Sequence, residues 1–307
     1  MKPTHLDERR KSTLIPSSEL PGLFPYTGGK TRLRSWLHEF LPKHMDTYAE
    51  AYVGSGGFFF GLEEGVATME AINDLDHEIY NVFKVLQDPV QFDILQRKLR
   101  LTPYSREFFS DAVNIHKSPV DFTSVASMQE HAWATMVGFA MSISGSGAKN
   151  AGNWGVSRVA TTQCVGRWNK RLFLLDKFHE RLSDVHIDNS DAVHFIHQWD
   201  SPTTVFYADP PYLRSTRKGR DRIYSTEMTP ERMDELLDTL FAARGAVLLS
   251  HYSEPSFDQL FLDRGWQLFT KDWYTTASTQ MQKRDARTAR TECAYLSPTL
   301  QKMLQNS

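Results

Sequence analysis

Short apolar runs alternate along this chain with longer stretches of helical apolar spacing. The runs read as buried strands, and the spaced stretches read as amphipathic helices. Strands are predicted around 48–53, 71–73, 205–208, 245–250, 265–269 and 293–296, and helices around 33–41, 92–101, 131–141, 168–182 and 230–241. Alternation of this kind predicts an α/β fold with a mixed, mostly parallel sheet and helices on both faces. The last two strands are expected to be antiparallel.

The same pattern predicts the domain organisation. Residues 1–22 lack the apolar core of a signal peptide and are expected to form a flexible extension. Residues 87–170 are too many for a simple connection between strands, so we expect an inserted, mainly helical subdomain. The catalytic domain is then predicted to comprise residues 23–86 and 171–300.

Composition changes this picture little. The chain has 307 residues, of which 40% are hydrophobic and 23% charged, enough for a full α/β core. No stretch approaches a membrane span, and a cytoplasmic enzyme is expected. Two cysteines indicate no disulfide framework, and no Cys/His cluster has metal-ligand spacing, so no metal is expected.

The net charge of −2 is a mild objection to nucleic-acid binding, although a basic run at 214–222 answers it in part.

The most informative motif follows the predicted strand at 205–208. It consists of Asp209, Pro210, Pro211 and Tyr212. Two prolines carry no backbone N–H, so this loop is rich in acceptors. Asp209 and the Pro210 carbonyl could accept both hydrogens of an amino group, while Tyr212 offers a flat face to a planar ring. This edge suits the exocyclic amine of a nucleobase, whose nitrogen would then attack an electrophile. A proline-rich turn without chemistry is the alternative.

Two further segments point to a nucleoside-like ligand. Gly54, Gly56 and Gly57 follow the first strand and are expected to form a tight turn into a helix. Their spacing is neither GxGxxG nor a phosphate loop. Asp74, after the second strand, stands where an acid commonly binds ribose hydroxyls. A surface carboxylate or helix cap is the alternative for Asp74.

A third segment, at residues 24–30, has the sequence FPYTGGK. It is expected to form a glycine turn into a helix. Its aromatic residue, glycines and lysine could hold a carboxylate-bearing ligand at a helix start. A surface turn with a solvated lysine is the alternative.

In this order, FPYTGGK, AEAYVGSGGFFF, NDLD and ADPPY resemble the motifs of the Dam-like adenine-N6 DNA methyltransferases. The resemblance extends from about Leu23 to about Pro298. It includes 185–191 as a third sheet motif and 290–293 as the start of the closing strand. Ser55 and the segment 189–192 depart from the usual family pattern.

The resemblance implies a Rossmann-like methyltransferase fold, S-adenosylmethionine as methyl donor and the N6 amine of adenine in double-stranded DNA as acceptor. It implies direct displacement at the sulfonium methyl and flipping of the target base onto Tyr212. Asp191 is implied as a partner of the cofactor's adenine amino group. The implied cofactor-binding residues are Tyr26, Gly28, Gly29, Lys30, Glu50, Tyr52, Gly54, Ser55, Gly56, Gly57, Asp74, Asp191 and Asp209.

By the same resemblance, residues 87–170 are the target-recognition subdomain. Side chains able to read base edges or contact phosphates are Lys149, Asn150, Asn153, Arg158, Arg214, Arg217, Lys218, Arg220 and Arg222. A linker around 149–154 and a solvated loop at 214–222 are the alternatives.

Three other functions share parts of this pattern. An RNA or protein amide N-methyltransferase would use the same acceptor geometry, but Asp209 and the long insertion argue against it. A catalytically silent DNA-binding regulator is opposed by the complete motifs. A nucleotide-dependent oxidoreductase lacks its glycine spacing. A restriction endonuclease counterpart and the oligomeric state are left open by the sequence.

Overall fold

The computed structural model describes residues 19–148, 153–155, 161–211, 228–274 and 289–306. The chain divides into two compact units. Unit 1 comprises Met1–Ser35, Val53–Gly65 and Asp74–Asn189, and unit 2 comprises Trp36–Tyr52, Val66–Asn73 and Ser190–Ser307. The predicted domain boundaries stay a prediction.

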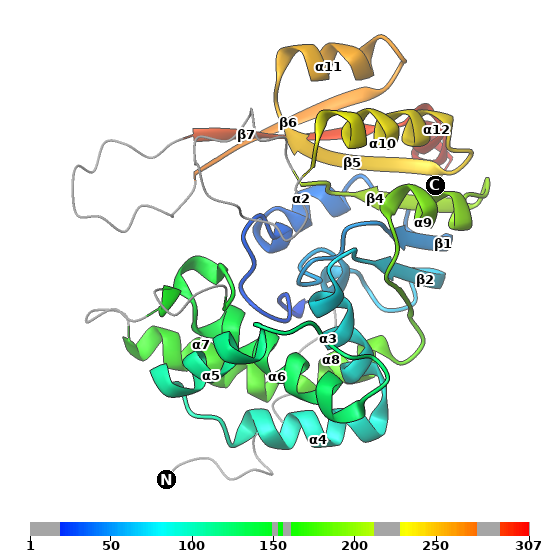
Figure 1. Ribbon diagram of the computed structural model, residues 1–307. Helices are drawn as coiled ribbons and strands as arrows, with labels where there is room; N and C mark the ends of the chain where they lie inside the picture. Colours follow the sequence, from blue (N-terminus) through cyan, green and yellow to red (C-terminus); the bar gives the residue numbers. More distant parts are fainter. Residues whose placement is uncertain (1–18, 149–152, 156–160, 212–227, 275–288, 307) are drawn as a thin grey trace. The chain divides into compact units, whose positions relative to one another are not determined.

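The fold is α/β, with a seven-stranded sheet in the order β3-β2-β1-β4-β5-β7-β6 (Figure 1). The strands are β1 (Met45–Glu50), β2 (Ala67–Asn73), β3 (His186–Asp188), β4 (Thr204–Ala208), β5 (Ala246–Tyr252), β6 (Gln267–Tyr274) and β7 (Ala289–Leu296). Within unit 2, β1 pairs in parallel with β2 and β4, and β4 with β5. As predicted, the last strands are antiparallel, with β7 between β5 and β6.

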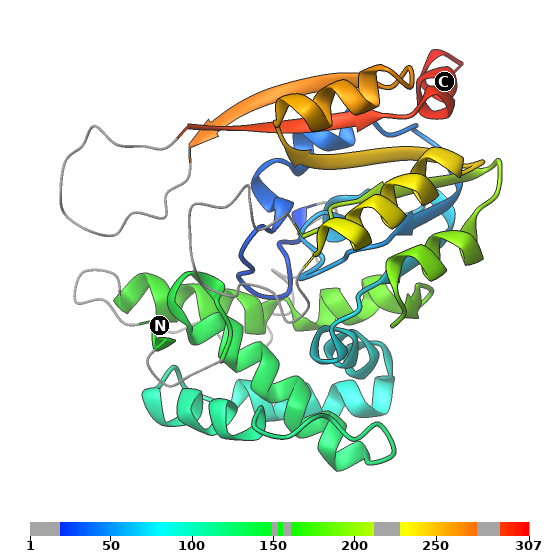
Figure 2. The ribbon, with the colours of Figure 1, turned by 45° about the horizontal axis from the view of Figure 1, so that its top comes forward.

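The core of unit 2 lies between one face of its strands and three helices, α9 (Ala192–Trp199), α10 (Pro230–Ala242) and α11 (Pro255–Leu262) (Figure 2). Phe206 and Ala208 point into this core from β4, and Val247 and Leu249 from β5. On β6, Leu268 packs against this core. Its neighbour Phe269 stacks instead on Phe40, which follows α2 (Arg34–His38) in the sequence. Because successive strand residues point to opposite faces, helical segments cover both faces of this part of the sheet.

Local signals set the helix starts in unit 2. Thr229 caps α10 by accepting a hydrogen bond from the Arg232 amide, and Pro230 occupies the first turn, as predicted. The C-terminal helix α12 (Pro298–Gln305) begins in the same way, because Ser297 caps it and Pro298 occupies its first turn.

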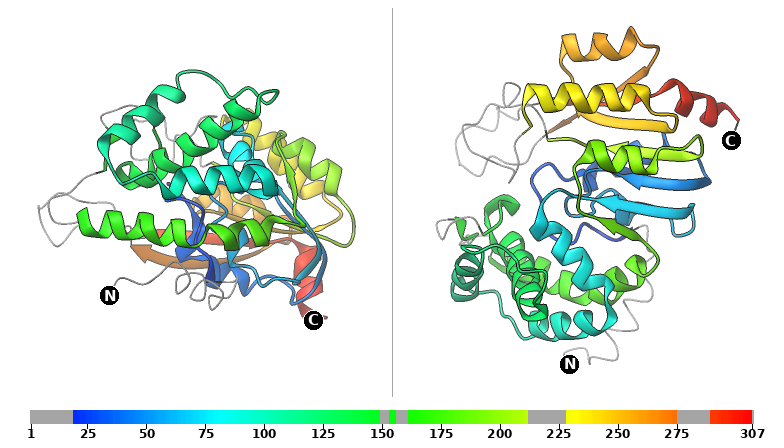
Figure 3. Two further views of the ribbon diagram at one scale, coloured as in Figure 1. Left: turned by 90° about the horizontal axis from the view of Figure 1, so that it is seen from below. Right: turned by 45° about the vertical axis from the view of Figure 1, so that its right-hand side comes forward.

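Unit 1 is mainly helical, and its helices pack together as Figure 3 shows. They are α3 (His77–Gln87), α4 (Pro89–Arg100), α5 (Arg106–Ile115), α6 (Val125–Met141), α7 (Thr161–Phe173) and α8 (Leu175–Leu182), with the short 3-10 turns η2 (Lys30–Arg32), η3 (Phe59–Gly61) and η4 (Ile143–Gly145). The predicted helices at 92–101 and 131–141 are confirmed by α4 and α6. None of the helices in the described ranges is long and apolar enough to cross a membrane.

Three helix predictions were wrong in extent. The predicted helix at 168–182 is two helices, because the chain leaves helical geometry at Leu174. The predicted helix after the glycine turn is the single 3-10 turn η3, whose Phe59 and Phe60 are fully buried. The stretch 33–41 forms only the five-residue α2. Buried aromatic packing outweighs local helical periodicity in the second case.

Candidate active site

The loop after β1 has a glycine turn that packs against the segment at residues 26–31, both within unit 1. Gly54 has φ +52°, and a Cβ there would lie 3.1 Å from the Tyr26 ring. A Cβ on Gly57 would lie 2.6 Å from Thr31 Oγ1. Between them, the Ser55 carbonyl accepts a hydrogen bond of 2.8 Å from the Leu23 amide. The turn therefore needs small residues, and two of the predicted cofactor segments lie together.

Gly56 provides a direct test of this turn. It has φ +71°, and an added Cβ would lie 2.5 Å from the buried Phe60 ring and 3.3 Å from Phe83. We expect Gly56→Ala to lower the free energy of unfolding by roughly 2–4 kcal/mol, from left-handed strain and overpacking. Urea unfolding measures this loss.

Gly65→Ala is the matched control. Gly65 also has a positive φ, +80°, but nothing lies within 4 Å of its added Cβ. We expect a loss of only about 1–2 kcal/mol from backbone strain. Equal losses for the two variants would contradict the packing account.

Asp74 follows the last residue of β2 and joins this turn. Its Oδ2 accepts a hydrogen bond of 2.8 Å from the Gly54 amide, and its Oδ1 accepts one of 2.9 Å from the Asp76 amide. Burial and, to a lesser extent, the nearby Asp76 carboxylate raise the pKa of Asp74 to about 7, although the two amide hydrogen bonds oppose the shift. Asp76 itself caps α3. The segment that contains Asp74 thus contacts the glycine turn through a partly exposed carboxyl group.

In unit 2, Asp209 is held by a hydrogen-bonded chain from two strands. Ser250 Oγ on β5 donates to Asp209 Oδ1 at 3.1 Å, and Tyr207 Oη on β4 lies 2.9 Å from Ser250 Oγ. A carboxylate only accepts, so the Ser250 hydrogen points to Asp209 and Tyr207 must donate to Ser250. Burial raises the pKa of Tyr207 well above its ordinary value, and the Asp209 charge adds to this, so Tyr207 stays protonated.

The strand register explains this contact, which the sequence did not predict. Tyr207 pairs with Leu248 and Ala208 with Leu249, so the next step brings Asp209 beside Ser250. Ser250 is fully buried. Its only sequence signal was a hydroxyl residue within an otherwise apolar strand.

The ends of β1 and β2 in unit 2 are joined by Asn73, another residue that sequence reasoning missed. Its Nδ2 donates to the Ala51 carbonyl at 3.0 Å, and its Oδ1 accepts from the Ser190 amide at 2.9 Å. Glu50, predicted to bind the cofactor, is buried and accepts a hydrogen bond of 2.7 Å from Tyr48 Oη. Tyr52 packs partly buried against the core of unit 2.

Asp191 has two partners within unit 2. Its Oδ1 caps α9 by accepting from the Val193 amide at 3.0 Å, and its Oδ2 pairs with Arg232 at 2.6 Å. Its predicted contact with a cofactor amine stays a prediction, and would have to share the carboxylate with Arg232.

The structure describes some of the other predicted site residues and not others. Lys30 is buried in η2, with its Nζ 3.4 Å from the Gly28 carbonyl, and Gly29 precedes this turn. Pro210 and Pro211 directly follow β4, and Asn153 lies in a described stretch of unit 1. Tyr212, Lys149, Asn150, Arg158, Arg214, Arg217, Lys218, Arg220 and Arg222 lie outside the described residues.

The adjacent parallel strands β2, β1 and β4 end at one edge of the sheet of unit 2. Beyond these ends the chain continues into Asp74, the glycine turn and Asp209 respectively. Open α/β sheets carry their ligand sites beyond the carboxyl ends of such strands. This arrangement is typical of α/β enzymes whose ligand site lies beyond the strand ends.

Residues 26–277 match the family described as D12 class N6 adenine-specific DNA methyltransferase. The chain belongs to this family, so it is an adenine-specific DNA methyltransferase and DNA is its substrate.

Two solved structures are also similar. One is a putative RNA methyltransferase from Pyrococcus horikoshii, with 9% identity and a TM-score of 0.38 over 96% of this chain and 98% of that one. The other is precorrin 8W decarboxylase from Methanobacterium thermoautotrophicum, with 9% identity and a TM-score of 0.35 over 86% and 89%. Likenesses this weak carry no argument about substrate.

Proposed function

We propose that the protein transfers a methyl group from S-adenosylmethionine to the N6 amine of an adenine flipped out of duplex DNA. The observation that carries the proposal is Asp209, placed directly after β4 and held by Ser250, with two prolines following it. Membership of the N6 adenine-specific DNA methyltransferase family supports methylation of adenine as the reaction. The acceptor-rich loop supplies a means to bind the amine.

The residues of unit 1 fit the proposed cofactor. Asp74 keeps lone pairs beyond its two amide partners, so it can accept hydrogen bonds from two ribose hydroxyls. Gly54 lets the Tyr26 ring lie against the turn at a distance that a Cβ would crowd. S-adenosylmethionine supplies the electrophilic methyl group when it is bound.

At the acceptor side, Asp209 and the Pro210 carbonyl would hold the two hydrogens of the adenine amine. Holding both hydrogens turns the nitrogen lone pair away from the ring and toward the methyl group. Formation of the N–C bond would break the bond between the methyl group and the sulfonium sulfur, which would leave as a neutral thioether. The methylated nitrogen would then lose one proton, and Asp209 would receive it. Positioning and electrostatics would supply most of the rate enhancement.

Base recognition is proposed for residues 87–170, whose described part is largely helical. Recognition by Asn153 and by the basic residues beyond the described ranges follows from the same proposal. An endonuclease partner stays an open prediction.

The first experiment is incubation of the purified protein with radiolabelled S-adenosylmethionine and unmethylated DNA, followed by single-molecule sequencing. We expect N6-methyladenine within one short motif. Label in RNA or protein but not in DNA would favour the related-substrate alternative. DNA binding without any transfer would favour a silent regulator.

Ser250 tests the positioning of Asp209. We expect Ser250→Ala to lower kcat about 10-fold, because Asp209 loses a hydrogen bond that orients it, worth about 1–1.5 kcal/mol. The KM for the methyl donor should change little. Tyr207→Phe keeps the Ser250–Asp209 contact and should have a smaller effect. An unchanged kcat in Ser250→Ala, with the same thermal stability, would contradict the positioning role.

A further inference from the structure

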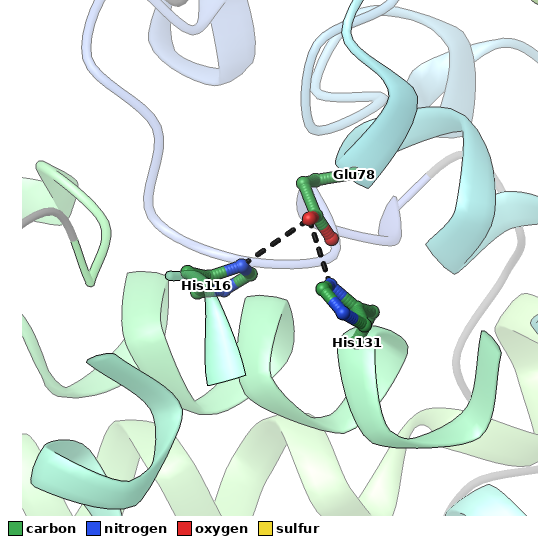
Figure 4. A group of neighbouring side chains, drawn as sticks. All are labelled: Glu78, His116 and His131. Atoms are coloured by element: carbon green, nitrogen blue, oxygen red, sulfur yellow. Dashed lines mark hydrogen bonds and ion pairs between the residues drawn. The ribbon is translucent and has the colours of Figure 1, made fainter. Parts of the chain in front are cut away.

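Three side chains of unit 1 that the proposed reaction does not use converge on one point (Figure 4). Glu78 lies in the first turn of α3, His116 directly follows α5, and His131 lies in α6. His131 Nδ1 lies 2.8 Å and His116 Nδ1 3.4 Å from the same oxygen, Glu78 Oε1. All the candidate ligand atoms lie within 4.8 Å of one another. One carboxylate and two imidazoles from three helical segments therefore face a common centre.

The geometry matches the ligand set of a borderline divalent ion. Zinc binds imidazole nitrogen and carboxylate oxygen at about 2.0–2.2 Å, so tetrahedral ligands lie roughly 3.3–3.5 Å apart. The His116–Glu78 separation of 3.4 Å matches this value, whereas the His131–Glu78 separation of 2.8 Å is that of a hydrogen bond and must lengthen by about 0.5 Å when an ion binds. Two histidines and one glutamate leave a fourth position for water.

The surroundings support a built site rather than a surface cluster. The side chain of His131 is only 5% exposed, whereas those of His116 and Glu78 are 18% and 25% exposed. Thr135 Oγ1, one helical turn beyond His131, donates to Glu78 Oε2 at 3.3 Å. Such a hydrogen bond orients a ligating carboxylate from the second coordination shell. A buried side plus a partly open side permits both rigid ligands and entry of an ion.

We propose that Glu78, His116 and His131 bind one zinc-like divalent transition ion, which joins the start of α3 to α5 and α6. This proposal opposes the prediction of no metal, which rested on spacing along the chain. The ion would link three segments of unit 1, and water would complete its coordination. The proposal of a metal site does not depend on the proposed methyl transfer.

The test uses the full chain, stripped of metal by dialysis against a chelator. Titration with zinc chloride, followed by calorimetry and by metal analysis after gel filtration, should give one ion per chain. Zinc at 100 times its Kd should raise Tm by roughly 4–8 °C. Magnesium chloride should give no shift, because magnesium prefers oxygen ligands in an octahedron.

Two variants assign the ligands. His116→Asn changes a partly exposed residue outside the helices, and Glu78→Gln keeps the shape of the side chain. We expect each to weaken zinc binding at least 100-fold and to abolish the zinc-dependent rise in Tm. His44→Asn, at an exposed histidine of unit 2, is the control and should bind zinc like the wild type.

Two results would overturn the proposal. One is wild-type protein that holds less than one zinc per chain. The other is stoichiometric zinc that survives both His116→Asn and Glu78→Gln. In either case the cluster is a hydrogen-bonded ion pair that needs no metal. Because neither DNA nor methyl donor is present, these results are independent of methyl transfer.

Discussion

Replacing Asp209 with alanine is expected to lower the rate of methyl transfer about 10³-fold or more while the fold is kept. Removal of one group that stabilises developing charge in a preorganised site typically costs about 10²–10³ in kcat. Loss of Asp209 is expected to lower kcat by at least as much, because Asp209 would both hold the amine and receive its proton. Single-turnover methylation of an unmethylated duplex measures the effect.

Three observations separate catalysis from folding in this test. Asp184→Ala removes an exposed carboxylate of unit 1 and should keep full activity. Asp209→Asn keeps one acceptor oxygen, so its activity should fall between those of wild type and Asp209→Ala. Near-normal transfer by Asp209→Ala would contradict the proposed role, whereas a lowered Tm would indicate that folding had been lost instead.

Replacing Asp74 with alanine is expected to weaken binding of S-adenosylmethionine about 10²-fold or more. Hydrogen bonds to a charged group contribute about 1.5–3 kcal/mol each, and two ribose hydroxyls would lose their acceptor. Calorimetric titration of the cofactor without DNA measures this loss. Asp93→Asn, at an exposed carboxylate of α4 in the same unit, should leave the Kd unchanged. An unchanged Kd in Asp74→Ala would remove Asp74 from the cofactor site.

The pH dependence of cofactor binding is a second test of the role of Asp74. In the free protein burial raises the pKa of Asp74 to about 7, so the group is largely protonated at pH 6. Hydroxyl donors favour the ionised form, so binding should release a proton below pH 7. Affinity should therefore rise as pH increases toward 7 and level off above it. Asp74→Asn, measured by calorimetry between pH 5.5 and 8.5, should show a flat profile.

The same shift has a defined sign for the stability of the free protein. The pKa of Asp74 is higher in the folded chain than in the unfolded chain, so the folded state binds the proton more tightly. The resulting contribution to stability is fully present below pH 4 and is lost as pH rises through about 7. Bound cofactor should offset this loss.

Much of the fold could be predicted from local sequence. The apolar run at 205–208 is β4, and Thr229 with Pro230 begins α10, because strand burial and helix capping depend on neighbouring residues. The prediction failed where distant packing outweighs local periodicity. Leu174 interrupts one continuous amphipathic pattern, and the buried aromatic residues after Gly57 leave only a 3-10 turn.

The candidate site follows the same division. The order of residues along the chain is enough to show which chemical groups follow which strands, namely the glycine turn after β1, Asp74 after β2 and Asp209 after β4, because these groups are adjacent to the strands in sequence. Their partners depend on the folded chain: Ser250 for Asp209, Gly54 for Asp74, and the two histidines for Glu78. These pairs depend on strand register and helix packing between residues far apart in the chain, which no local spacing encodes.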